Sequence, residues 1–153
     1  MIIGDSSALI ALAVIDKLDL LEKLFDELYV PKAVFDEVTK IEKPQSDKLK
    51  KFLQNKVKTV NLKLKKLGLG LGELEAITLY KELSADVLFI DDDRAKKFAV
   101  LNDVKVIGTL GVLIKAKEKG FIKRIKPLLD EMLKAKIFIS KKMILKVLKI
   151  CDE

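Results

Sequence analysis

The stretch Val87-Leu88-Phe89-Ile90-Asp91-Asp92-Asp93 passes from four apolar side chains directly to three carboxylates. An unbroken apolar run of this length is typical of a strand that is buried on both faces, as in a parallel sheet. A similar run, Met1-Ile2-Ile3-Gly4, is followed at once by Asp5. Because adjacent parallel strands end at the same edge of a sheet, where open α/β sheets bind ligands, we expect these two acidic stretches to lie close together.

The rest of the chain alternates between strand-like and helix-like segments. Besides residues 1–4 and 87–90, strands are expected at 28–30, 57–62 and 104–107. Helices are expected at 8–15, 16–25, 31–41, 44–53, 73–83 and 95–101, and Thr109 is expected to cap another. This alternation predicts βαβ units and a parallel α/β sheet. After Gly120 the pattern is helical only, around 127–134 and 141–148, so we expect one domain over residues 1–153 with a helical tail at 120–153.

The composition restricts the chemistry that is available. The chain has no histidine and a single cysteine, Cys151. These counts exclude histidine metal ligands, the Ser-His-Asp triad, the Cys-His pair, a cysteine zinc site and an internal disulfide. The hydrophobic content of 50% excludes a disordered chain. Any catalysis must therefore use carboxylates, hydroxyls, lysines or a bound ion.

The net charge of +7, from 30 Lys and Arg against 23 Asp and Glu, has two interpretations. A basic excess favours an anionic partner, of which nucleic acid is the commonest. It is equally typical of a lysine-rich surface that serves solubility or heat tolerance. No basic signal region and no apolar stretch of about 20 residues is apparent, so we expect a cytoplasmic protein without a membrane partner.

Two glutamates add to the acidic set. Glu37 has Ala33, Val34 and Ile41 at helical spacing, which predicts that it points inward and needs a cation. Glu73 follows Gly72 in a first helical turn, where it either complements the helix dipole or projects into a cleft. Carboxylates that converge without histidine favour Mg²⁺ or Mn²⁺, which relieves their repulsion. In nucleases such an ion activates water and stabilises charge on the phosphate.

Each acidic residue also has a structural interpretation. Asp5 or Ser6 can cap the first helix, and at least one of the aspartates at 91–93 can cap another. Glu37 can be a surface residue, and Glu73 can simply complement a dipole. The alternating glycines at 68, 70 and 72 follow the lysine-rich segment 63–66. They can cradle phosphate, but no lysine-serine pair follows, so a flexible loop before a helix is the better interpretation.

Four segments in order resemble the PIN domain, and especially its DUF3368 branch, which is related to the VapC toxins. They are Ile3–Ser7, Val30–Val38, Gly70–Ile77 and Ile90–Ala95; Gly108–Gly111 and the tail from Pro127 to Glu153 also resemble that branch. The resemblance thus covers nearly the whole chain. It implies a three-layer α/β/α fold with a central parallel sheet, and hydrolysis of single-stranded RNA with Mg²⁺ or Mn²⁺. For a toxin, it also implies a small antitoxin protein as partner.

The resemblance assigns roles residue by residue. Asp5 corresponds to the first acid, with Ser6 as its hydroxyl neighbour, and Glu37 to the second. Glu73 corresponds to the third, with Glu75 as a possible substitute. The fourth lies among Asp91, Asp92 and Asp93. Asp92 is favoured because many relatives have Thr-x-Asp there, although Ile90 replaces the threonine; Asp91 is a further candidate metal ligand. Ser6, Arg94, Lys96 and Lys97 are the candidate RNA-binding residues, the basic ones through phosphate contacts.

Three functional hypotheses follow. The first is a metal-dependent endoribonuclease, as a toxin or alone. The second is a PIN-like module that binds RNA or a partner with weak or no catalysis. The third is an unrelated α/β phosphohydrolase or phosphotransferase with Asp5 as nucleophile, which is disfavoured because such enzymes prefer Asp-x-Asp and Ser7 occupies the third position. Apolar residues of the tail, at 137–139, 144, 145 and 148, either pack on the core or form a partner surface, and we expect a homodimer.

Overall fold

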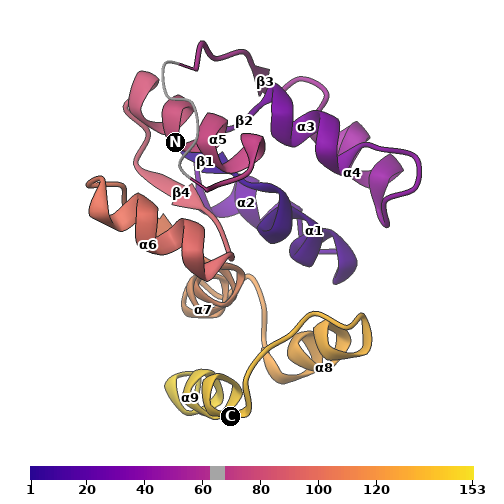
Figure 1. Ribbon diagram of the computed structural model, residues 1–153. Helices are drawn as coiled ribbons and strands as arrows, with labels where there is room; N and C mark the ends of the chain where they lie inside the picture. Colours follow the sequence, from indigo (N-terminus) through magenta and orange to yellow (C-terminus); the bar gives the residue numbers. More distant parts are fainter. Residues whose placement is uncertain (63–67) are drawn as a thin grey trace.

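The computed structural model describes residues 1–62 and 68–153, and has a five-stranded sheet with helices on both sides (Figure 1). The lysine-rich segment 63–66 lies outside the described residues. In chain order the elements are β1 (Ile2–Gly4), α1 (Ser6–Val14), α2 (Asp19–Leu24), β2 (Leu28–Pro31), α3 (Lys32–Val38), α4 (Ser46–Leu53), β3 (Val57–Lys58), α5 (Leu71–Glu82), β4 (Val87–Phe89), α6 (Asp93–Leu101), β5 (Val106–Ile107), α7 (Thr109–Glu118), α8 (Lys126–Lys134) and α9 (Lys141–Ile150).

The strand order is β3-β2-β1-β4-β5, and every neighbouring pair is parallel. The central strand β1 lies beside β4, with Gly4 opposite Phe89. The chain after β1 and the chain after β4 therefore leave the same edge of the sheet. This confirms the predicted parallel α/β sheet and places Asp5 near the aspartates at 91–93.

Alternate residues of β1 enter two different hydrophobic cores. Ile2 packs with α1, α2, α3, α4 and α7 on one face, whereas Ile3 packs with α5 and α6 on the other. Both side chains are fully buried. Because successive side chains of a strand point to opposite faces, a strand covered on both sides must be apolar throughout. The three-layer α/β/α arrangement follows directly, and it is confirmed.

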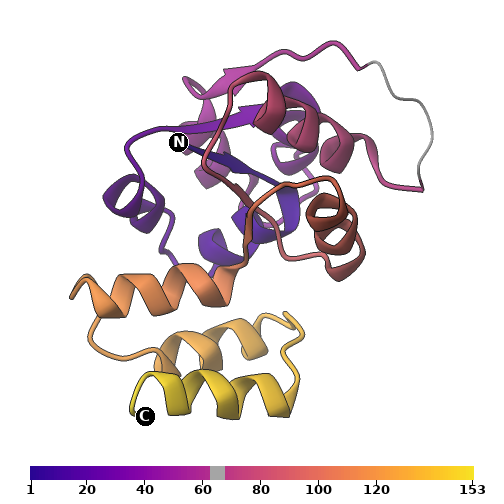
Figure 2. The same ribbon diagram turned by 90° about the vertical axis from the view of Figure 1, so that its left-hand side faces the viewer.

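The helical tail belongs to the first of these cores. Leu129 and Met132 of α8, Val147 of α9 and Cys151 are buried in the same cluster as Ile2. Figure 2 shows α8 and α9 as a layer beneath α7. Of the tail's apolar residues, four pack partly against the core, at 137, 139, 144 and 148. Phe138 and Leu145 remain 89% and 69% exposed. Homodimerisation stays a prediction.

Several predicted boundaries were wrong. The helix expected from Asp16 begins at Asp19, because Asp16 has φ 55°, a left-handed conformation that ends the preceding segment. The helix after Pro31 ends at Val38, short of Ile41. The strand expected at 57–62 pairs only at Val57 and Lys58. Within the described residues, the structure has no helix of the length and apolarity that a membrane crossing requires.

Candidate functional site

Asp5 is the buried centre of the candidate site. It occupies the N-cap position of α1, directly after β1, and is only 3% exposed. Gly4 allows this tight strand-to-helix passage, since a Cβ there would lie 3.1 Å from Cδ1 of Leu9 and 3.2 Å from Cγ1 of Val30. The Asp5 side chain makes no capping hydrogen bond to α1. The capping interpretation of its carboxylate is therefore wrong.

The electrostatics of Asp5 connect it with the other predicted acids. Burial raises the pKa of Asp5 from 3.8 to about 7, although a hydrogen bond with the Ser6 backbone lowers it. The negative charges of Glu73, Glu37 and Asp92 raise it further. These are the three acids that the sequence grouped with Asp5. The structure thus brings four carboxylates within electrostatic range of one another, around a buried group that is poorly stabilised as an anion.

Glu37 reaches the site from α3. Its Oε2 accepts a hydrogen bond of 2.7 Å from the hydroxyl of Ser6. The expectation that Glu37 points into an apolar stripe was wrong: Glu37 is exposed, and Ile41, beyond the helix, is 96% exposed. Glu37 therefore lies at the solvent side of the site and the Ser6 hydroxyl fixes one of its oxygens. Ser6 itself is buried and is the first residue of α1, after the N-cap Asp5, so it does not occupy the capping position.

Glu73 and Glu75 both lie on α5 but point to different partners. Glu73 is in the first turn, as predicted. Glu75 accepts a 2.8 Å hydrogen bond from the backbone N–H of Ala33, at the start of α3. A carboxylate in that position satisfies a free helix donor and complements the dipole. Glu75 therefore joins α5 to α3, the helix that carries Glu37, whereas Glu73 contributes to the charge around Asp5.

The three aspartates after β4 are now distinguished. Asp92 is the N-cap of α6, and its Oδ1 accepts a 2.8 Å bond from the N–H of Ala95. Asp91 accepts bonds of 2.7 and 2.6 Å from the N–H and hydroxyl of Thr109. Asp93 is exposed in the first turn of α6. Asp92 is therefore the aspartate that caps a helix. Its Oδ1 makes the capping bond, and Oδ2 takes no part in that bond.

Thr109 is a residue whose role the sequence interpretation missed. It does not cap α7, because Gly108 occupies the N-cap position and Thr109 begins the helix. Thr109 is 1% exposed and both its donors bind Asp91. A signal was present, since Gly108-Thr109-Leu110-Gly111 was among the segments that resemble the family. The pattern alone did not reveal its partner eighteen positions earlier.

The candidate RNA-binding cations on α6 differ in the contacts that they make within the protein. Arg94 donates to the carbonyl of Gly68, which has φ 72°. Lys96 and Asp91 both lie close to Gly108: a Cβ there would be 2.9 Å from Lys96 Nζ and 2.8 Å from Asp91 Oδ1. Lys97 is exposed. Binding of RNA by these residues, and by Ser6, remains a prediction.

The donor set suits a hard cation in its chemistry. It consists of carboxylate oxygens and a hydroxyl, the ligands that Mg²⁺ and Mn²⁺ prefer. A cation would also offset the repulsion that raises the pKa of Asp5. Across residues 1–62 and 68–153, however, no three acidic side chains are close enough to hold one ion in their present rotamers. Ligation by three carboxylates therefore requires side-chain rotation. Glu37 and Asp92 are exposed, but each would rotate at the cost of a hydrogen bond, from Ser6 to Glu37 and from the N–H of Ala95 to Asp92.

Comparison with known proteins agrees with this geometry. No curated protein and no solved structure matches the chain. A sequence model of one protein family, described as "DUF3368: PIN domain", matches residues 1–153. The parallel α/β sheet with its C-terminal helices is consistent with that fold. The chain therefore belongs to the DUF3368 family of PIN domains.

Proposed function

We propose that the protein is a metal-dependent endoribonuclease that cleaves single-stranded RNA. PIN domains are mostly metal-dependent nucleases, and membership of the family supports nuclease activity in general. The observation that carries the finer proposal is the buried Asp5, whose pKa is raised to about 7 by burial and by the charges of Glu73, Glu37 and Asp92. A site that concentrates negative charge around a buried carboxylate is suited to a divalent cation.

Asp5, Glu37, Glu73 and Asp92 would hold Mg²⁺ or Mn²⁺, with Asp91 as a further candidate. When bound, such an ion activates water for attack on phosphorus and stabilises charge on the phosphate. The Ser6 hydroxyl holds one oxygen of Glu37 in place. The bond from Glu75 to the start of α3 fixes the helix that carries Glu37. Thr109 holds Asp91 beside β5 and α7.

The decisive test is cleavage of a labelled single-stranded RNA by the purified protein with Mg²⁺ or Mn²⁺. We expect cleavage that EDTA abolishes and that Asp5→Asn reduces at least a hundredfold. Asp36→Asn is a matched control, because Asp36 is the exposed neighbour of Glu37 and, among residues 1–62 and 68–153, forms an ion pair with Lys32 alone. Calorimetric titration of Mn²⁺ into each variant gives a second readout. Cleavage that survives in Asp5→Asn would contradict the proposal.

A second candidate is a PIN-fold module that binds RNA or a partner without efficient catalysis. It is favoured by the structural bonds of Asp91 and Asp92 and by the separation of the carboxylates in the described residues. RNA binding without cleavage across several RNAs, and without Mn²⁺ binding, would favour this module over the nuclease.

The most specific part of the proposal is that the nuclease acts as a toxin. We propose that the nuclease is restrained by a small antitoxin protein in the same cell. Expression should then arrest growth, and Asp5→Asn should abolish the arrest while Asp36→Asn should not. Arrest that persists in Asp5→Asn would contradict a toxic activity of this site.

A further inference from the structure

The charge of the chain is divided unevenly between its two parts. Residues 121–153 carry nine Lys and Arg against four Asp and Glu, a net +5. Residues 1–120, which contain the acidic site, carry 21 against 19. A polyanionic substrate is repelled by a carboxylate cluster and gains affinity from basic surface elsewhere. The sequence places the excess of basic residues in the C-terminal segment 121–153, which includes α8 and α9.

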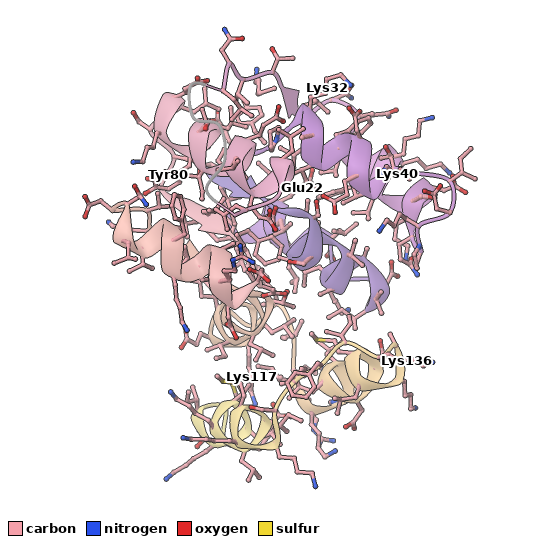
Figure 3. The ribbon with its side chains drawn as sticks, viewed as in Figure 1. Glu22, Lys32, Lys40, Tyr80, Lys117 and Lys136 are labelled. Atoms are coloured by element: carbon pink, nitrogen blue, oxygen red, sulfur yellow. The ribbon has the colours of Figure 1, made fainter. Side chains whose placement is uncertain are left out.

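Helix α9 concentrates this charge on one exposed face. Lys142, Lys146 and Lys149 are spaced by four and three residues, so they project from the same side of the helix. All three are exposed, and Leu145 lies among them with 69% of its surface exposed. The opposite side carries Val147 and is buried. Figure 3 shows nitrogen-ended side chains pointing outward from α9.

The positive charge of the α9 lysines is not balanced by acidic residues of the same helix. The helix contains four lysines and no Asp or Glu. None of the four forms an ion pair with any residue of the described ranges 1–62 and 68–153. Lys141 and Lys142 even stand in the first turn, where a positive charge opposes the helix dipole. These charges lower the stability of the helix, and a bound anion would offset their repulsion. The arrangement therefore favours a role of α9 in binding an anion.

The direction of α9 relates its first turn, rather than its whole lysine face, to the end of the molecule that carries the acidic site. Figure 2 shows α9 running in the same direction as α7. Lys117, near the end of α7, bonds the carbonyl of Cys151 just beyond the end of α9. The first turn of α9 therefore lies toward the beginning of α7, where Thr109 contacts Asp91. With ten residues, α9 presents about 15 Å of basic surface that extends away from that end.

We propose that the exposed lysine face of α9, formed by Lys142, Lys146 and Lys149, binds the phosphate backbone of the RNA that enters the acidic site. This inference rests on the proposed function and names where that substrate gains its affinity. A second copy of the chain is a poor occupant, because two such faces would repel each other. RNA fits better, since lysines contact phosphates while Leu145 is available to the bases or ribose between them.

The test is RNA binding in EDTA, where cleavage is blocked, measured by fluorescence anisotropy of a labelled oligouridylate over a range of salt concentrations. In the triple variant Lys142→Gln, Lys146→Gln, Lys149→Gln we expect at least a tenfold weaker affinity. The slope of log K against log salt should fall by about 2, the value for three lost single-strand phosphate contacts. The triple variant with arginine at the same positions should restore both.

The matched control removes the same charge elsewhere. Lys43→Gln, Lys50→Gln, Lys51→Gln alters three exposed lysines of α4 and the turn before it, on the opposite side of the molecule from α9 (Figure 1). We expect less than a twofold change in affinity for this variant. Equal losses in both variants, or none in the α9 variant, would overturn the inference. Binding of phosphatidylglycerol vesicles that needs α9, with RNA binding that does not, would overturn it in favour of a membrane surface.

Failure of this inference is distinguishable from failure of the proposed function. If RNA binding depends on α9 but the protein never cleaves RNA, the proposed nuclease activity is contradicted and the proposed RNA-binding face of α9 is supported. If the wild type cleaves RNA with metal, and the α9 variant has unchanged KM and unchanged RNA binding, the RNA-binding face of α9 is contradicted and the nuclease activity is supported.

Discussion

Asp5 is a residue whose ionised form the fold disfavours. Burial raises its pKa to about 7, against 3.8 for an exposed carboxyl. Between these pH values the folded, metal-free protein binds a proton that the unfolded chain has released. The stability associated with neutral Asp5 is therefore fully present below about pH 4 and is lost as the pH rises to 7. A divalent cation would act in the opposite direction, by stabilising the carboxylate.

We predict that Asp5→Asn is more stable than the wild type at pH 8 in EDTA, by at most about 4 kcal/mol. Asparagine has nearly the same shape and carries no charge, so the difference should shrink toward zero at pH 4. Urea unfolding at the two pH values measures this change, with Asp36→Asn as the exposed control. A stability difference that is the same at both pH values would contradict the assigned burial and charge of Asp5.

At this scale the sequence could locate the acids but not their partners. Asp5 and the aspartates at 91–93 were predictable because carboxylates directly follow apolar strands. The bond between Thr109 and Asp91 was not, because it depends on how α7 is placed against the end of β4. Similarly, Glu37 was expected to be buried from helical spacing, but α3 ends before the apolar Ile41 could extend the stripe.

At the scale of elements, the contact between α3 and α5 determines where Glu37 lies. The helices approach closely at Gly72, in the first turn of α5. A Cβ on Gly72 would lie 3.2 Å from Glu37 Oε2, 3.4 Å from Val34 Cγ2 and 3.8 Å from Ser6 Oγ. The glycine thus leaves space for the carboxylate that Ser6 holds. The expected loop at Gly72 was wrong, and the helical glycine has a packing reason.

We predict that Gly72→Ala separates stability from function. Alanine favours a helix by up to about 1 kcal/mol, and Glu37 can move because it is exposed, so the free energy of unfolding should stay equal or rise. Displacement of Glu37 should weaken Mn²⁺ binding and RNA cleavage. We expect a loss of roughly tenfold, the lower end of the effect of mutating a residue that orients a metal ligand. Urea unfolding and Mn²⁺ titration test the two halves. Unchanged Mn²⁺ affinity would contradict a role for Glu37 at the site.

Glu153 attaches the end of α9 to the rest of the tail. Its carboxylate accepts bonds of 2.8 Å from the N–H of Ile125, 2.7 Å from Lys117 and 3.1 Å from the N–H of Lys126. Burial raises its pKa, but these bonds outweigh burial and lower it from 4.5 to about 2. The stability that the ionised group contributes is therefore present above about pH 4.5 and is lost as the pH falls toward 2.

We predict that Glu153→Gln destabilises the protein at pH 7, and that the difference from the wild type becomes clearly smaller at pH 2.5, because the contribution of the carboxylate is lost as the pH falls through its pKa of about 2. Glutamine keeps the size of the side chain but loses the charge that Lys117 and the two backbone donors favour. Thermal unfolding at both pH values measures the effect. Glu118→Gln, a change at a neighbouring glutamate on α7, is the control and should change stability little at either pH.

At the scale of the whole molecule, the sequence indicated a helical tail but not its relation to the core. The helical periods of α8 and α9 were predictable from the apolar spacing. Their partners were not, because the same apolar stripe can face the core or another chain. In the structure Leu129, Met132 and Val147 join the cluster that contains Ile2 of β1, while the lysines of α9 face solvent. The tail is thus part of the hydrophobic core and also carries the exposed lysines of α9.

This packing predicts that the tail and the sheet unfold together, as one domain over residues 1–153. Leu129 is 1% exposed and Leu12 of α1 is fully buried, and both belong to the same cluster. Leu129→Ala should therefore cost about 2–5 kcal/mol, as should Leu12→Ala, and each should lower the midpoint of one shared transition. Calorimetry, with circular dichroism in parallel, tests this prediction. Two separate transitions, of which only the lower one responds to Leu129→Ala, would show instead that α8 and α9 form an independent unit. The single transition is expected because α8 covers apolar surface of α1, so neither part can keep its side chains from water when the other unfolds.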